Sequence, residues 1–131
     1  WKKSKMRNVY MPRFLFLLPA ELRDVIKPVV KLTGTGGGSD DVTSTDDKLF
    51  LLSQAEVCGD STYTADGEGE QYEYFKDAAN RVKRRGGSAG IWWLRSPHVS
   101  SSTLFRCAFS MGGVGSYDAS TAYGVSFGFC V

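Results

Sequence analysis

Two short stretches, Trp92-Trp93-Leu94-Arg95-Ser96-Pro97 and Gly124-Val125-Ser126-Phe127-Gly128-Phe129, decide how this chain of 131 residues is expected to fold. The first is a largely apolar run that a proline stops, which is typical of a buried strand. The second alternates apolar residues with Ser and Gly, as a strand with one buried face does. We therefore expect a strand over 91–97 and a core strand over 124–131 that closes the fold.

Between these stretches the residue types alternate over 103–110, which predicts another strand. Its inward set is expected to be Phe105, Cys107 and Phe109, and its outward set Leu104, Arg106, Ala108 and Ser110. Met111-Gly112-Gly113 supplies a turn after it. The last third of the chain therefore predicts a meander-like antiparallel sheet.

The N-terminal half predicts short helices and strands joined by polar loops. Apolar residues at helical spacing predict a helix over 19–27, which Pro28 ends, and a β-branched run predicts a strand over 29–33. The Gly-, Ser-, Thr- and Asp-rich segment 34–47 predicts a long loop. The apolar run 48–52 predicts a short strand buried on both faces.

A capping box and a second helix follow. Ser53 and Glu56 have the spacing at which each side chain bonds the other residue's backbone amide, so they predict the start of a short helix. Residues 60–70 predict a polar loop, and the spacing over 72–82 predicts a helix. Its end would be the basic run 83–85 before two glycines, which favours helix-end electrostatics over contact with nucleic acid.

These elements predict a single α+β domain over 1–131, with two or more helices packed on small antiparallel sheets and long loops. Within it, residues 124–131 form the closing strand. The chain begins on Trp1-Lys2-Lys3-Ser4 without a signal-peptide pattern, and a start on tryptophan suggests that an earlier strand is missing.

Composition excludes several classes of function. A net charge of +2 gives no electrostatic basis for binding nucleic acid, and no apolar run approaches the roughly 20 residues of a membrane span. His98 is the only histidine, and the three cysteines lack zinc-site spacing, so we expect no metal and no cofactor. The glycines of 34–38 lack a following Gly-Lys-Ser/Thr, and the aspartates of 40–47 lack EF-hand spacing.

Residues 98–127 have an unusual composition. They contain no Lys, Glu, Gln or Trp, whereas residues 1–97 contain 18 of these. With the exception of Met111, the residues present are those reached when the first two bases of an asparagine codon are randomised. A Ser- and Gly-rich sheet region explains the composition equally well, and such a surface would also suit adaptable recognition.

The two opening stretches, together with Trp1-Lys-Lys-Ser-x-x-Arg7 and the segment 47–56, resemble a widespread bacterial domain of unknown function. That domain is related to the formylglycine-generating-enzyme branch of the C-type lectin fold. More narrowly, the chain is similar to the variable proteins of diversity-generating retroelements, whose gene ends are rewritten by an error-prone reverse transcriptase. The resemblance covers nearly the whole chain and implies a C-type lectin-like fold.

The resemblance also implies how the chain is divided and which positions vary. Residues 1–97 would be the scaffold part, 98–123 the variable part and 124–131 the closing strand. Trp92, Trp93, Leu94, Arg95, Phe105 and the last strand would form the constant scaffold. The diversified ligand-binding positions would be His98, Ser100, Ser101, Thr103, Leu104, Arg106, Ser116, Tyr117, Asp118, Ser120, Ala122 and Tyr123, and the alternation adds Ala108 and Ser110. Family spacing would make Cys107 and Phe109 variable too, but periodicity places them inside.

The implied function is a non-catalytic receptor-binding or adhesion domain on a virion or cell surface, with a cell-surface protein or glycan as its partner. The alternative is a structural or adhesive module of a bacterial surface protein with a fixed partner. Calcium-bridged sugar binding is not expected, because the tripeptides that carry it are absent. An enzyme of the formylglycine type is not expected either, because Cys107 and Cys130 are too far apart in sequence.

Overall fold

The N-terminal part of the chain is more helical than its sequence predicts. The computed structural model, which describes residues 1–131, has a π-helical turn η1 (Met6–Tyr10) that leads into α1 (Met11–Leu17). Pro12 lies in the first turn of α1, directly after η1, and has no amide hydrogen to donate to a carbonyl of that preceding turn. The following helix α2 (Ala20–Val25) confirms the helix expected over 19–27.

A hairpin occupies much of the segment whose composition predicts a loop. β1 (Val29–Gly34) is the expected strand, and β2 (Val42–Asp47) pairs with it antiparallel over its full length. The loop predicted over 34–47 is therefore wrong for the second half of that segment. Threonine and valine favour strands, and the indole of Trp1 anchors the end of β2 by donating to the Asp47 carboxylate at 2.8 Å.

The centre of the chain follows the predicted pattern closely. β3 (Phe50–Leu51) is a short buried strand, and α3 (Gln54–Cys58) begins at the predicted capping box. The Glu56 amide donates to Ser53 Oγ at 3.1 Å, and the Ser53 amide donates to Glu56 Oε2 at 2.9 Å. Gly59 ends the helix in the left-handed conformation, with φ of 75°.

The helix expected over 72–82 is absent. Two separate 3₁₀ turns, η2 (Glu73–Phe75) and η3 (Ala78–Arg81), take its place. Asp77 lies between them in an extended conformation, and its side chain accepts a hydrogen bond from the Ala79 amide at 2.9 Å. This local bond competes with a continuous helix, so the backbone restarts as a second turn.

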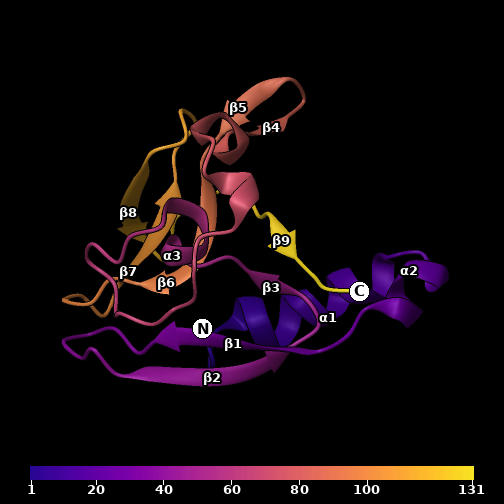
Figure 1. Ribbon diagram of the computed structural model, residues 1–131, viewed down its shortest axis with the longest axis horizontal. Coiled ribbons are helices and arrows are strands. Elements are labelled where there is room, and N and C mark those ends of the chain that lie inside the picture. The colour runs from indigo at the N-terminus through magenta and orange to yellow at the C-terminus, as the bar shows by residue number, and fades with distance from the viewer.

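The basic run that was expected to end that helix is instead a strand. β4 (Lys83–Arg85) pairs with β5 (Ser88–Gly90) as a hairpin that projects from one side of the molecule (Figure 1). The connecting residues, Gly86 and Gly87, have φ of 57° and 84°. A two-residue hairpin turn with both φ values positive favours glycine, so the glycines form this turn and not a helix stop.

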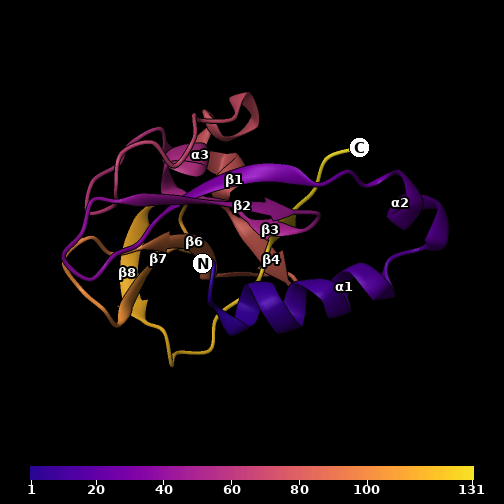
Figure 2. The ribbon, with the colours of Figure 1, turned by 90° about the horizontal axis from the view of Figure 1, so that it is seen from below.

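The predicted meander sheet is present. β6 (Trp92–Pro97), β7 (Leu104–Ala108) and β8 (Val114–Asp118) form an antiparallel sheet in that order. The register shifts between Trp93 and Pro97, where the β6 backbone bulges. The sheet stands at one end of the molecule, opposite α2, in both ribbon views (Figures 1 and 2).

The closing strand is much shorter than predicted. Only β9 (Phe127–Gly128) is a strand within 124–131, and it pairs with β3. Val125, Phe129 and Val131 are exposed, so the prediction of a core strand over the whole segment is wrong. β3 offers only two residues for pairing, and the chain beyond β9 runs outward along the α2 side of the molecule (Figure 1).

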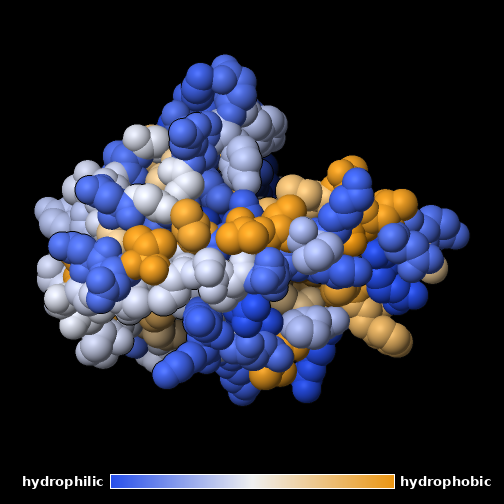
Figure 3. Space-filling model, turned by 60° about the horizontal axis from the view of Figure 1, so that its bottom comes forward, coloured by the Kyte–Doolittle hydropathy of each residue, from blue (hydrophilic) through white to orange (hydrophobic).

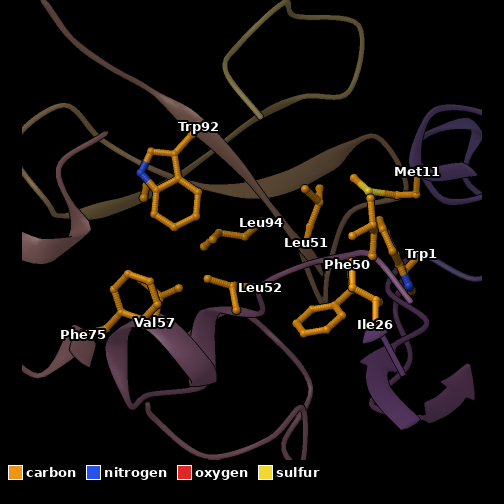
Figure 4. Packing of buried hydrophobic residues seen from close by; sticks show 12 residues of the cluster. Trp1, Met11, Ile26, Phe50, Leu51, Leu52, Val57, Phe75, Trp92 and Leu94 are labelled. Carbon is orange, nitrogen blue, oxygen red and sulfur yellow. The ribbon is translucent and has the colours of Figure 1, made fainter. Parts of the chain in front are cut away.

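The hydrophobic core contains twelve buried residues and joins the sheets to the helices (Figure 4). At one end Trp92 packs near Phe75 and Val57, and at the other Trp1, Met11, Ile26 and Phe50 lie together, with Leu51, Leu52 and Leu94 between them. Chain segments far apart in sequence thus share one core.

The observed architecture is α+β, with few helices and small antiparallel sheets. Each sheet has only two or three strands, so long connections surround them. None of the helices has the length and apolar character that crossing a lipid bilayer requires.

Candidate functional site

The strand β7 forms where it was predicted, but its burial does not alternate, because its first two residues are half-buried and its last three are buried. Ala108 pairs with Trp92 and is completely buried, and Arg106 is only 6% exposed, although both were expected to face outward. The predicted orientation of these two residues is therefore wrong. Arg106 is accommodated inside because Gln54 and Ser116 accept hydrogen bonds from its guanidinium.

The other face of the same sheet is aromatic. Trp93 contacts Tyr123 with ring centroids 5.4 Å apart, Tyr123 contacts Tyr117 at 5.0 Å, and Tyr117 contacts Phe109 at 6.1 Å. We call these four residues the aromatic face. Tyr117 is 38% exposed and the other three are half-buried, so the rings form a continuous and accessible surface. Phe109, expected inside, therefore belongs to this surface, whereas Cys107 beneath it is buried as expected.

A glycine makes room for the aromatic face. Gly115 lies opposite Cys107 on β8, and a side chain at this position would overlap the ring of Phe109. The absence of a Cβ lets Phe109 lie directly on the strand and meet Tyr117 edge-on. The aromatic face thus depends on the backbone as well as on the ring side chains.

A cavity of about 460 Å³ adjoins the aromatic face through Trp93. It lies between the N-terminal segment and the sheet, and its walls are mainly apolar, with Met6, Tyr10, Leu51 and Phe105 among them. Lys5 and Ser4 supply polar groups at the same cavity. Largely apolar hollows with a few polar groups are the usual form of ligand pockets.

A buried ionic cluster joins β6 to the neighbouring segments of the fold. Arg95 on β6 donates to both carboxylate oxygens of Glu56, and Lys31 donates to Glu56 Oε1 at 2.8 Å. Burial alone would raise the pKa of Glu56, but the hydrogen bond and charge of Arg95 and the hydrogen bond of Lys31 outweigh it and lower that pKa. Arg95 also donates to the backbone carbonyls of Leu32 and Leu51, so it ties β1 and β3 to β6.

A second buried carboxyl lies beside this cluster. Glu68 is fully buried, and it accepts hydrogen bonds from the Ser96 hydroxyl and, at 2.7 Å, from the Gly34 amide. Burial raises the pKa of Glu68, the nearby charge of Glu56 raises it further, and the hydrogen bonds only partly oppose this. The loop 60–70 is thereby joined to β1 and β6 by one side chain.

The predicted ligand-binding residues fall into separate groups. Tyr117 and Tyr123 belong to the aromatic face, whereas Arg106 and Ser116 lie on the opposite side of the sheet with Leu104 and Asp118. His98 stacks on Tyr63, whose ring lies over the Arg106 guanidinium. The remaining predicted residues are surface or turn positions, except for the buried Ala108; they are Ser100, Ser101, Thr103, Ser110, Ser120 and Ala122.

Three residues of these surfaces were not predicted from the sequence. Trp93 was assigned to the scaffold and Phe109 to the interior, because apolar residues on an alternating strand are normally taken as its buried side. Tyr63 lies in the loop 60–70 with no periodic signal around it, and its φ of 63° is unusual for a residue other than glycine. Only the fold places it against His98.

The reactive groups of the chain are scattered. All three cysteines are free, and burial raises the pKa of the Cys107 thiol to about 11 and also raises that of Cys58. Cys107 is therefore protonated at neutral pH and is a poor nucleophile. No three His, Cys, Asp or Glu side chains gather closely enough to hold a metal ion.

The comparisons with known proteins place the chain in a family but do not describe its activity. No curated protein matches the chain, and no solved structure matches it. A family model described as a domain of unknown function, DUF6273, matches residues 1–131. Because this match spans the entire chain, the protein belongs to the DUF6273 family.

Proposed function

We propose that this protein is a non-catalytic ligand-binding domain whose contact surface lies on the last third of the chain. The observation that carries the proposal is the aromatic face, a row of four accessible rings. The other side of the same sheet packs against the core. Tyrosine and tryptophan supply large, rigid contact area at low cost in conformational entropy, and they dominate binding hot spots. The cavity beside Trp93 extends this surface and would accept an apolar group of the ligand.

We further propose that this surface is diversified by retroelement mutagenesis on a C-type lectin-like fold. Exposed positions such as Ser100, Thr103, Ser120 and Ala122 support this, because they pack against little of the core. Substitutions at such positions usually change stability by less than about 0.5 kcal/mol. The buried Arg95 cluster and Trp92 would keep the framework constant while the surface changes.

Sequencing the 3′ end of the gene across a natural population tests the diversification. We expect substitutions at asparagine-type codons after residue 97, including the codons for Phe109, Tyr117 and Tyr123. The buried Ala108 serves as an internal control and should stay constant. Substitutions scattered evenly over the chain would overturn the proposal. A population in which the codons for Phe109, Tyr117 and Tyr123 stay constant while those of buried core residues vary would overturn it as well.

The alternative, a structural or adhesive module with a fixed partner, has one observation in its favour. Phe16 and Leu17 on α1 are 75% and 76% exposed. Apolar side chains gather where α1 and α2 lie, at the right of the space-filling view (Figure 3). Large exposed apolar patches commonly mark interfaces. A neighbouring reverse-transcriptase gene with a near-copy of the 3′ end would favour diversification, and its absence would favour the fixed module.

A further inference from the structure

Arg106 is a buried cation without an ion pair. The other two buried cations, Lys31 and Arg95, both pair with Glu56. No carboxylate lies within ion-pair distance of the Arg106 guanidinium. A buried charge normally has a partner, because taking an unpaired ion out of water is costly.

Two of the three guanidinium nitrogens of Arg106 donate hydrogen bonds within the protein, and the third does not. Its Nε donates to Gln54 Oε1, and its Nη1 donates to Ser116 Oγ. Its Nη2 makes no hydrogen bond in the protein, yet it is not among the buried polar atoms that lack a partner, so it reaches solvent. The ring of Tyr63, which is 59% exposed, lies 5.5 Å from the guanidinium carbon. The unbonded Nη2 is thus accessible to solvent.

The chain has one other buried carboxyl or basic side chain without an ion pair, and that side chain can lose its charge, whereas arginine cannot. Glu68 also lacks an ion pair, but burial raises the pKa of its carboxyl and so favours the neutral acid. Burial lowers the pKa of Arg106, but a guanidinium stays protonated in proteins. No carboxylate of the chain forms an ion pair that would neutralise it.

The nearest carboxylate does not fill this role. Asp60 Oδ1 accepts hydrogen bonds from Gln54 Nε2 at 2.6 Å and from the Thr62 amide at 2.9 Å. It forms no ion pair with Arg106, although its negative charge acts on the guanidinium at longer range. Asp118 on β8 is exposed, and its Oδ1 accepts from Ser120. The charge of Asp60 would oppose the binding of a further anion, so such an anion needs direct hydrogen bonds to the guanidinium.

We propose that Arg106 binds a carboxylate from outside the chain, through Nη2 and the free N–H of Nη1, on the side of the sheet opposite the aromatic face. We propose that this carboxylate belongs to an acidic side chain of a protein partner. Two parallel N–H groups match the two oxygens of a carboxylate. The ring that a sugar would stack on, Tyr63, is already in contact with His98 and Arg106, which favours a peptide over an acidic glycan. The inference does not rest on the aromatic face, because Arg106 lies on the other side of the sheet.

The experiment is an NMR titration of the ¹⁵N-labelled full chain with sodium acetate. We expect saturable shifts of the Arg106 Nε–H signal and of the Ser116 amide, with no such saturation in sodium chloride at the same ionic strength. Arg106→Lys, which keeps the charge but not the paired donors, should weaken acetate binding several-fold. If that variant does not fold, the wild-type titration still decides: no saturable shift at Arg106, or an equal one with chloride, overturns the proposal.

A second arm identifies the source of the carboxylate. N-acetylglutamate amide and glucuronate carry the same group on a peptide unit and on a sugar, and we expect the former to bind more tightly. Tighter binding of glucuronate would overturn the assignment to a protein partner. Failure of the acetate titration would leave the aromatic face and the sequencing test untouched, whereas even scattering of substitutions would overturn the proposed function without affecting the titration.

Discussion

Arg95 donates two hydrogen bonds to Glu56, from Nη1 to Oε2 at 2.5 Å and from Nη2 to Oε1 at 3.1 Å. One residue comes from the strand that carries the aromatic face, and the other caps α3. The same guanidinium also donates to three backbone carbonyls, those of Leu32, Leu51 and Glu68. The pair therefore joins β6 to four other segments, and this arrangement supports the proposed binding surface.

Removing this arginine should strongly destabilise the protein. Arg95→Met leaves Glu56 buried with only Lys31 as a cation and leaves several carbonyls without a donor. Breaking a buried pair in this way costs about 3–5 kcal/mol. Urea denaturation measures the loss. Lys76→Met is the matched control, because its ion pair with Glu73 is exposed and its loss should leave the free energy of unfolding nearly unchanged. Equal losses in the two variants would contradict the assigned role.

The raised pKa of Glu68 predicts a specific dependence of stability on pH. A carboxyl whose pKa is higher in the folded state than in the unfolded state binds more protons when folded. Its contribution is complete below the ordinary pKa of glutamate, about 4.3, and is lost as pH rises through the folded value. Glu68→Gln removes this titration. The stability of the wild type relative to this variant should therefore fall as pH rises from acid toward neutrality.

Urea denaturation of both proteins over a pH series measures this difference. The titration of Glu56, whose pKa is lowered, occurs in both proteins and cancels in the comparison. A difference that stays constant with pH would show that the Glu68 carboxyl does not change its protonation on folding.

Gly115 should control the position of Phe109. In Gly115→Ala the new methyl group would overlap the Phe109 ring, which is the free end of a side chain and can move. We expect the loss of stability to be at the lower end of the roughly 1–3 kcal/mol of overpacking substitutions. The near-ultraviolet circular dichroism of the aromatic face should change clearly. Gly113→Ala, where the nearest atom of Phe109 would be 3.8 Å away, is the control and should keep the spectrum.

The cysteines should differ widely in reactivity. Cys130 is exposed, Cys58 is half-buried with a raised pKa, and Cys107 is buried with a pKa of about 11. Because the thiolate is the reactive form, iodoacetamide at neutral pH should label Cys130 first and Cys107 only after unfolding. Peptide mass spectrometry after timed labelling measures the order. Rapid labelling of Cys107 in the folded protein would contradict its burial beneath the aromatic face.

Features that depend on near neighbours could be predicted from the sequence. The capping box needs only Ser53 and Glu56, three residues apart, so the start of α3 was correct. The strands β1, β6 and β7 were recognised from β-branched or alternating residues for the same reason. The helix over 72–82 failed, because one side chain, Asp77, bonds the local backbone and interrupts it.

The site was only partly predictable. Tyr117 and Tyr123 were among the expected binding residues, and the structure brings them together. Phe109 was assigned to the interior and Arg106 to the surface, because polarity is the only guide to orientation when one strand is considered alone. That guide fails here because Gln54 and Ser116 accept hydrogen bonds from the buried Arg106, while Phe109 lies on the accessible side of the sheet.

By itself the sequence determined the α+β class, the capping box of α3 and the position of β7, because each follows from contacts within a few residues. Only the tertiary structure decided which side of β7 faces the core. Gln54, from a distant helix, supplies the acceptor that makes a buried Arg106 tolerable, and Gly115 supplies the space that allows Phe109 to lie outside. Burial is a property of the assembled chain, since it depends on what the other segments bring to each face.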